Sequence, residues 1–161
     1  MPRLAFLVSA LAHAAAVAWS AAVLPDRVPT HWGADLRPDA WGSRAGLVTA
    51  AALGGAALAA LFTGLAALVR RIPLTYVNVP HTDHWTSAAN VPALRTRLRS
   101  DVLWIGAATL LLLAGLTVLS TQAARSDGQR LPWTFVVLLL GYLVALAGRC
   151  GWMYRVRYRP D

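Results

Sequence analysis

Long apolar runs alternate with short polar stretches along this chain of 161 residues. Each apolar run approaches or exceeds the roughly 20 residues that a helix needs to cross a bilayer. The runs cover residues 4–24, 46–69, 102–121 and 131–148. The pattern therefore predicts an all-α polytopic membrane protein, a bundle of four transmembrane helices that forms a single membrane domain over residues 1–161. It leaves an outer loop at residues 25–45 and an inner loop at residues 70–101.

The first apolar run also resembles a secretory signal peptide, because Arg3 precedes it and Ser20-Ala21-Ala22 supplies small residues near its end. The apolar core of a signal peptide is about 7 to 15 residues long, and this run is longer. Pro25 then follows at once. We therefore expect an uncleaved first span.

Composition supports a lipid environment, because 57% of the residues are hydrophobic and only 14% are charged, a balance that a soluble domain hardly tolerates. The formal net charge is +8. The chain contains no Lys, so all fifteen of its strongly basic residues are arginine, and it contains no Glu. This usage, together with abundant alanine, is typical of a GC-rich bacterial genome. We expect a multi-pass protein of a bacterial plasma membrane.

The placement of the arginines predicts the orientation of the chain. Ten of the fifteen fall in the N-terminus, the inner loop and the C-terminal tail, which share one side of the membrane if the four spans are correct. Because Lys and Arg are enriched on the cytoplasmic side, we expect both termini in the cytoplasm and the outer loop outside. Arginines beside apolar spans indicate contact with anionic lipid, so we expect no nucleic-acid partner.

Small residues at helical spacing predict how the spans pack. The second span carries one ridge at Gly46, Ala50 and Gly54, and neighbouring ridges at Gly55 with Ala59 and at Ala60 with Gly64. Such ridges let helix backbones approach closely inside lipid, so we predict that the second span lies at the centre of the bundle. The alternative is that an alanine-rich sequence scatters small residues everywhere.

His13 lies about midway through the first span, where an ionisable side chain is a candidate functional site by default. Two interpretations stay open. A neutral imidazole can bond a neighbouring helix, or His13 can line the pathway of a small transporter or permease component that acts as a homo-oligomer.

The outer loop holds three prolines and two glycines, which exclude a long helix and predict an ordered chain of turns and short extended pieces. Its motif residues are Leu24, Pro25, Asp26, Val28, Pro29, His31, Trp32, Gly33, Pro38, Asp39, Trp41 and Gly42. They resemble the hallmark loop of a bacterial membrane family called domain of unknown function 1648, in which the loop follows the first transmembrane helix. This chain departs from the family at Leu36-Arg37, where relatives usually place a glycine just before the Pro-Asp step.

The inner loop extends the resemblance, because it is similar to a segment that many relatives carry between their second and third spans. Its motif residues are Asn78, Pro80, His81, Asp83, His84 and Trp85. The same domain opens the SdpI-type immunity proteins, which protect bacteria against a secreted toxin and relay its presence to a repressor. The resemblance thus implies an outer loop that senses or neutralises an extracellular peptide, and an inner loop that docks a cytoplasmic regulator.

Metal binding is a further hypothesis, because histidine and carboxylate side chains are common ligands of zinc. The candidate ligands are His31, Asp35 and Asp39 in the outer loop and His81, Asp83 and His84 in the inner loop. The alternative is that His31 and Asp26 bond backbone groups that the turns leave unpaired. If the topology is correct, the two loops lie on opposite faces and their histidines cannot combine in one site.

The sequence carries no glycine-rich phosphate loop, nucleophile elbow or zincin helix, and a single cysteine, Cys150, excludes a disulfide within the chain. We therefore expect a non-enzymatic protein without a cofactor, and keep a metal-dependent membrane hydrolase as the alternative. Arg95, Arg97 and Arg99 stand at alternate positions before the third span. Such charges spread around a helix, so we expect a segment that faces lipid headgroups or a docked regulator.

Overall fold

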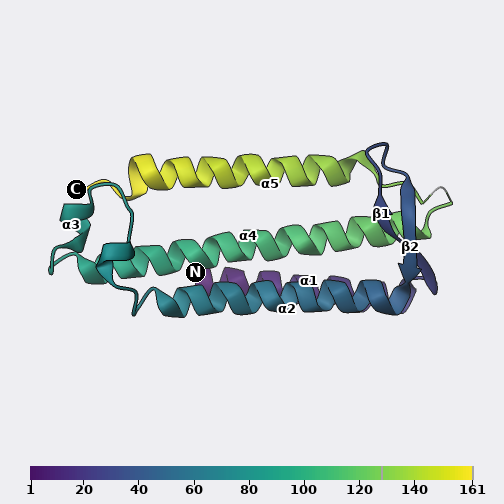
Figure 1. The fold of residues 1–161 in the computed structure, drawn as a ribbon, viewed down its shortest axis with the longest axis horizontal. Helices are drawn as coiled ribbons and strands as arrows, with labels where there is room; N and C mark the ends of the chain where they lie inside the picture. Colours follow the sequence, from purple (N-terminus) through teal and green to yellow (C-terminus); the bar gives the residue numbers. More distant parts are fainter. Residues whose placement is uncertain (128, 161) are drawn as a thin grey trace.

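Four long helices lie side by side in the computed structural model, which describes residues 1–127 and 129–160 (Figure 1). They are α1 (Pro2–Val23), α2 (Arg44–Leu68), α4 (Val91–Arg125) and α5 (Trp133–Trp152). Each is long and apolar enough to cross a membrane, so the predicted bundle of four membrane helices is confirmed. The shorter elements are β1 (Arg27–Trp32), β2 (Pro38–Ser43), a 3-10 turn (Leu74–Tyr76), α3 (Thr82–Thr86) and a π-helical turn (Met153–Arg157).

The two strands form a hairpin at one end of the bundle, whereas α3 and both chain termini lie towards the other end (Figure 1). We call the second end the arginine-rich end, because it carries the arginines of the N-terminus, of residues 70–99 and of the C-terminal tail. Which face of the membrane each end occupies stays a prediction.

The helix boundaries follow from local sequence. Pro92 stands in the first turn of α4, where a missing amide hydrogen costs nothing. The Ser43 side chain caps α2 by accepting a hydrogen bond from the Gly46 amide, at 3.1 Å. Helix α4 begins at Val91 rather than at the predicted Val102, so residues 91–101 of the predicted inner loop are helical. They extend α4 beyond its apolar segment.

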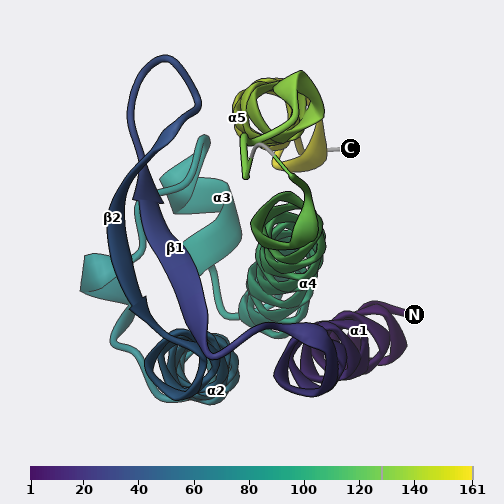
Figure 2. The ribbon, with the colours of Figure 1, turned by 90° about the vertical axis from the view of Figure 1, so that its right-hand side faces the viewer.

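The centre of the bundle is α4, and the prediction that the second span lies there is wrong. Helix α4 contacts α1, α2 and α5, and Figure 2 shows it between α5 and the pair formed by α1 and α2. Only Gly55 and Ala66 of α2 are buried. Gly54 and Gly64 would have no heavy atom within 4 Å of an added Cβ, so two of the four glycines on α2 make no close contact. Small residues permit close packing only where another helix lies against them, and no helix lies against Gly54 or Gly64.

One small residue of α2, Gly55, does allow a close approach between helices, because it lies against the His13 ring of α1. An added Cβ at Gly55 would lie 2.2 Å from the His13 ring of α1, and the His13 Nε2–H donates to the Ala51 carbonyl of α2 at 3.1 Å. The carbonyl can only accept, so Nε2 carries the proton and the ring is held in that tautomer. His13 is 5% exposed and joins two helices. This is the structural interpretation of His13; its role in transport stays a prediction.

Helix α5 packs differently from the other three, because none of its residues is buried. Its attachment at the arginine-rich end runs through Asp101 of α4, which is 2% exposed. Arg149 donates to this carboxylate at 2.6 Å, Arg157 at 2.8 Å and the Tyr158 hydroxyl at 2.9 Å. Burial raises the pKa of Tyr158 and the Asp101 carboxylate raises it further, so the phenol stays protonated and donates.

We predict that Gly55→Ala destabilises the protein by about 1–3 kcal/mol, because the new methyl group collides with the His13 ring. The free energy of unfolding, measured by titration with a denaturing detergent, checks this. Gly54→Ala is the matched control and should change it little, since the neighbouring position is open. Equal effects of the two substitutions would contradict the close contact.

Asp101→Asn should cost about 3 kcal/mol, because it leaves two arginines without the carboxylate that neutralises them. The same titration measures the loss. Asp83→Asn changes an exposed carboxylate at the same end of the molecule and serves as the control. An unfolding free energy unchanged by Asp101→Asn would mean that the cluster does not hold α5.

Candidate functional site

The outer loop folds into an antiparallel hairpin, in which Arg27 pairs with Ser43, Val28 with Gly42 and Pro29 with Trp41. The expected short extended pieces are therefore two paired strands. The register then shifts at two points and leaves Thr30 and Asp39 without a partner. Bulges of this kind bend a hairpin and redirect its side chains. The hairpin runs from the start of α2 to a turn that lies beside α5 (Figure 2).

The hairpin turn is strained at Leu36, which has a φ of 64°. This left-handed region places Cβ close to the backbone and favours glycine. The turn is closed by two backbone hydrogen bonds at 2.9 Å, from Gly33 to Arg37 and from Leu36 to Gly33.

The base of the hairpin is fixed to the bundle by Arg44. Its guanidinium donates to the Leu24 carbonyl at 3.0 Å and pairs with Asp26 at 2.9 Å. Beneath this pair, Val28 is fully buried against Leu24 and Ala124. Pro29 is buried as well, so the first half of β1 is a packed element rather than a free loop.

The far part of the hairpin is bound to the connection between α4 and α5. The indole Nε1 of Trp32 donates to the Gln129 carbonyl at 2.8 Å. The Leu131 amide donates to the Leu36 carbonyl at 3.0 Å. These bonds join segments about one hundred residues apart in the chain, and they tie the start of α5 to the hairpin.

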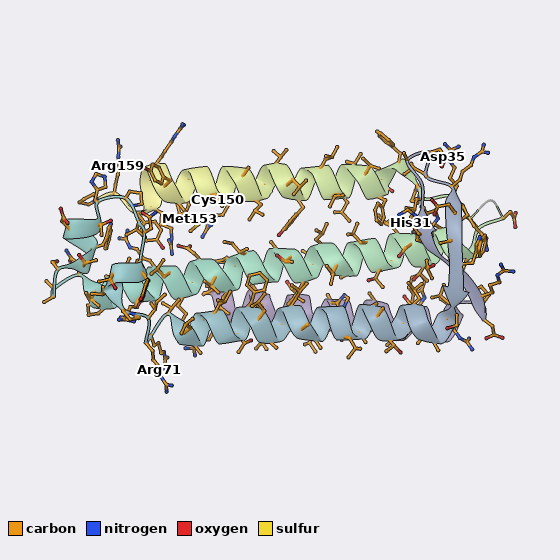
Figure 3. All side chains as sticks on the ribbon, in the orientation of Figure 1. His31, Asp35, Arg71, Cys150, Met153 and Arg159 are labelled. Atoms are coloured by element: carbon orange, nitrogen blue, oxygen red, sulfur yellow. The ribbon has the colours of Figure 1, made fainter. Side chains whose placement is uncertain are left out.

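The other motif residues of the hairpin pair with side chains. Asp39 accepts a hydrogen bond from His31 Nδ1 at 2.6 Å, and both side chains are more than half exposed. Asp35 lies at the turn, where its carboxylate accepts a hydrogen bond from the Arg37 backbone amide at 3.1 Å and lies 3.8 Å from the Arg37 guanidinium (Figure 3). Asp26 pairs with Arg44. His31 thus bonds the carboxylate of Asp39 across the hairpin, and Asp26 bonds the guanidinium of Arg44 at its base. The expectation that His31 and Asp26 bond backbone groups is therefore wrong.

A cavity of about 450 Å³ lies beneath the hairpin, within the size range of ligand pockets. The hairpin contributes Thr30, His31 and Trp32. Apolar side chains from four helices and the α4–α5 connection form most of the walls, and a group of hydroxyls adds polar positions. The apolar residues include Val17, Leu24, Leu47, Val48, Leu113, Leu116, Leu131 and Phe135, and the hydroxyls are those of Ser20, Thr117, Ser120 and Thr121.

Two of the hydroxyls form a fixed pair between helices. Ser20 of α1 and Thr121 of α4 lie 2.7 Å apart, and both are buried. Ser20 also donates to the Ala16 carbonyl at 2.8 Å, so the hydrogen of the interhelical bond comes from Thr121. The cavity thus has apolar walls, an ordered polar pair on one side and a hairpin with exposed His31 at its rim.

The inner-loop motif lies at the arginine-rich end, away from this cavity. Trp85 of α3 is 3% exposed and its indole donates to the Tyr158 carbonyl at 2.8 Å. The Arg97 guanidinium stacks on the same ring, 4.5 Å from its centroid. Asn78, His81 and Asp83 are exposed, Pro80 is partly exposed, and exposed His84 accepts from the Asn90 amide at 3.2 Å. Trp85 therefore secures the C-terminal tail.

The metal hypothesis receives no support from the arrangement of either loop. Among residues 1–127 and 129–160, no three His, Cys, Asp or Glu side chains gather closely enough to hold an ion. In the outer loop, the candidate ligand Asp35 pairs with Arg37 while His31 pairs with Asp39. The four-residue spacing of His31, Asp35 and Asp39 would align their side chains only on a helix, and this loop is a bulged hairpin.

The segment that builds the hairpin also matches a known family model. Residues 6–55 match the family described as a domain of unknown function, DUF1648. This segment is a DUF1648 domain. It comprises most of α1, the hairpin and the first half of α2, so DUF1648 supplies the hairpin and two of the cavity walls. Comparison with curated proteins and with solved structures gave no significant match. The relation to SdpI-type immunity proteins stays a prediction.

Sequence reasoning missed the walls that come from outside DUF1648. Thr117, Ser120 and Thr121 are polar residues that cluster near the end of a predicted span. This clustering could have indicated a polar site, but their neutral side chains give a weaker signal than charged ones. Asp101 stands one position before the same predicted span, so hydrophobic length alone places it in a loop. Nothing in the sequence indicates that Gln129 or Leu131 bonds the hairpin, because both contributions come from backbone atoms.

We expect Leu36→Gly to stabilise the hairpin by roughly 0.5–1 kcal/mol, because glycine relieves the left-handed strain and loses only part of that gain to chain entropy. Hydrogen exchange at the Gly33 amide, which closes the turn, should slow accordingly. Ala34→Gly is the control, since Ala34 has no positive φ and gains no relief. Faster exchange in Leu36→Gly than in the wild type would contradict the strain.

Proposed function

We propose that this chain is a non-enzymatic membrane protein whose hairpin-covered cavity binds the apolar part of an amphipathic ligand arriving from the outer face. The observation that carries the proposal is the cavity itself, with apolar walls, an internal hydroxyl pair and a polar rim at His31. A ligand with an apolar body and a polar end satisfies both kinds of surface.

The way in which the hairpin is attached supports a sensing role. Its base is packed at Val28 and fixed by Arg44, whereas its far part is held by the Trp32 and Leu131 hydrogen bonds. A ligand that displaces the far part breaks these two bonds and frees the start of α5. Because α5 continues to the Asp101 cluster, its movement reaches the arginine-rich end, where the inner loop and the tail meet. This is the proposed relay to a docked regulator.

The orientation needed for this function follows the arginine distribution. Cytoplasmic termini place the hairpin outside, where an extracellular peptide or lipid-like molecule reaches it. The alternative function, a small transporter acting as an oligomer, rests on His13. That side chain already donates to the Ala51 carbonyl, which favours its structural role.

Photocrosslinking tests the proposed cavity with the full chain in lipid nanodiscs. The probe is a diazirine-bearing palmitate, which has an apolar chain and a carboxylate end. We expect its crosslinks to concentrate on the hairpin and on the part of α4 that carries Thr117, above the level on exposed α5 positions such as Val144. An even distribution over all lipid-facing residues would count against a ligand cavity.

A pair of tryptophan substitutions on α4 sharpens this test. Thr117→Trp fills the cavity and should reduce hairpin crosslinks several-fold, whereas Leu111→Trp adds the same ring to a position that is 58% exposed and should leave them unchanged. Ala50→Phe repeats the filling from the α2 wall. Crosslinks that survive both filling substitutions would overturn the proposal.

A further inference from the structure

A second pocket, of about 380 Å³, lies at the arginine-rich end between the start of α1, the end of α2 and the first turns of α4. We call it the arginine pocket. It is lined chiefly by Arg3, Arg70, Arg95, Arg99, Ser100 and Leu103. Nothing in the hairpin cavity depends on it, and it lies outside the contacts of the Asp101 cluster.

Within residues 1–127 and 129–160, no carboxylate forms an ion pair with the four arginines of this pocket. In the part of the chain that the structure describes, the ion pairs of arginine involve Arg37, Arg44, Arg149 and Arg157 instead. Arg95 donates to the Val69 and Ile72 carbonyls, where it caps the end of α2. The Nε of Arg99 is buried and has no hydrogen-bond partner. A buried donor of a charged group without a partner is costly, so an acceptor at this atom would stabilise the folded chain.

The charges converge because of helix geometry. Arg95 and Arg99 are four residues apart on α4 and share one face, whereas Arg97 points to the opposite side and stacks on Trp85. Arg3 and Arg70 approach from α1 and α2, and both repel the Arg99 guanidinium. Arg3 also stands in the first turn of α1, where the helix dipole disfavours a cation. The arrangement is electrostatically unfavourable without an anion.

We infer that the arginine pocket binds a phosphate-bearing anion. Guanidinium groups donate two parallel hydrogen bonds to phosphate oxygens, and Ser100 adds a hydroxyl at the pocket wall. Leu103 and Pro2 line the same pocket, so its edge is apolar and adjoins the membrane-spanning part of α4. This position fits the headgroup of an anionic phospholipid, with a soluble phosphate as the other source of the same chemistry.

The test uses the purified full chain and four probes: cardiolipin, phosphatidylglycerol, phosphatidylcholine and inorganic phosphate. Native mass spectrometry counts retained lipid, and thermal unfolding with each probe measures stabilisation. We expect the anionic lipids to be retained and to raise the melting temperature, and phosphatidylcholine to do neither. Stabilisation by inorganic phosphate with the same dependence on arginine would assign the site to a soluble phosphate instead of a headgroup.

Two substitutions separate the pocket from general surface charge. Arg99→Gln and Arg3→Gln should each weaken retention of the anionic probe about tenfold, as expected for loss of a charge-assisted hydrogen bond. Arg71→Gln removes the same charge from a side chain that points away from the bundle and should change retention little (Figure 3). Arg3 is exposed near the N-terminus, so Arg3→Gln keeps the test valid if Arg99→Gln fails to fold. Equal retention by Arg3→Gln, Arg71→Gln and the wild type would overturn the inference.

Discussion

The buried carboxylate of Asp101 must be neutralised, because an unpaired ion in such surroundings costs several kcal/mol. Arg149, Arg157 and the Tyr158 hydroxyl meet this need, and all three come from the end of α5 and the tail. Their donation fixes the C-terminal part of the chain against α4, while Trp85 covers the tail from the other side. At its opposite end α5 follows Leu131, which bonds the hairpin. A helix that buries no residue is thus held by polar contacts at its two ends and by one hydrogen bond along its length, which joins Thr109 of α4 to the Tyr142 hydroxyl at 2.8 Å.

This arrangement explains why the hairpin cavity needs the whole chain. The DUF1648 segment supplies the hairpin, α1 and the first half of α2, but Thr121 completes the hydroxyl pair and Phe135 closes the wall from α5. The bonds from Trp32 and Leu131 exist only when the α4–α5 connection is in place. The cavity is therefore a property of the assembled bundle, and the hairpin alone does not contain it.

The sequence predicted the number and order of the membrane helices, because hydrophobic length is a local property. It also predicted that the Pro-rich outer loop is ordered and extended, since Pro29 and Pro38 restrict the backbone. It did not predict which helix is central. Small residues mark possible contacts, but among the four glycines of α2 only Gly55 meets a bulky partner, the His13 ring, whereas Gly106 and Gly115 of α4 face Phe62 and Leu138. Nor could it predict contacts between distant backbone atoms, such as those at Gln129 and Leu131, because the identity of a side chain says nothing about them.

Helix α5 also carries the one cysteine of the sequence, Cys150, which is exposed and directly follows the Arg149 that contacts Asp101. A nitroxide or fluorophore attached to this thiol reports on the one long helix of the bundle that buries none of its residues. Spectroscopy can therefore follow the C-terminal helix in the native sequence, without an engineered labelling position and without removal of competing thiols.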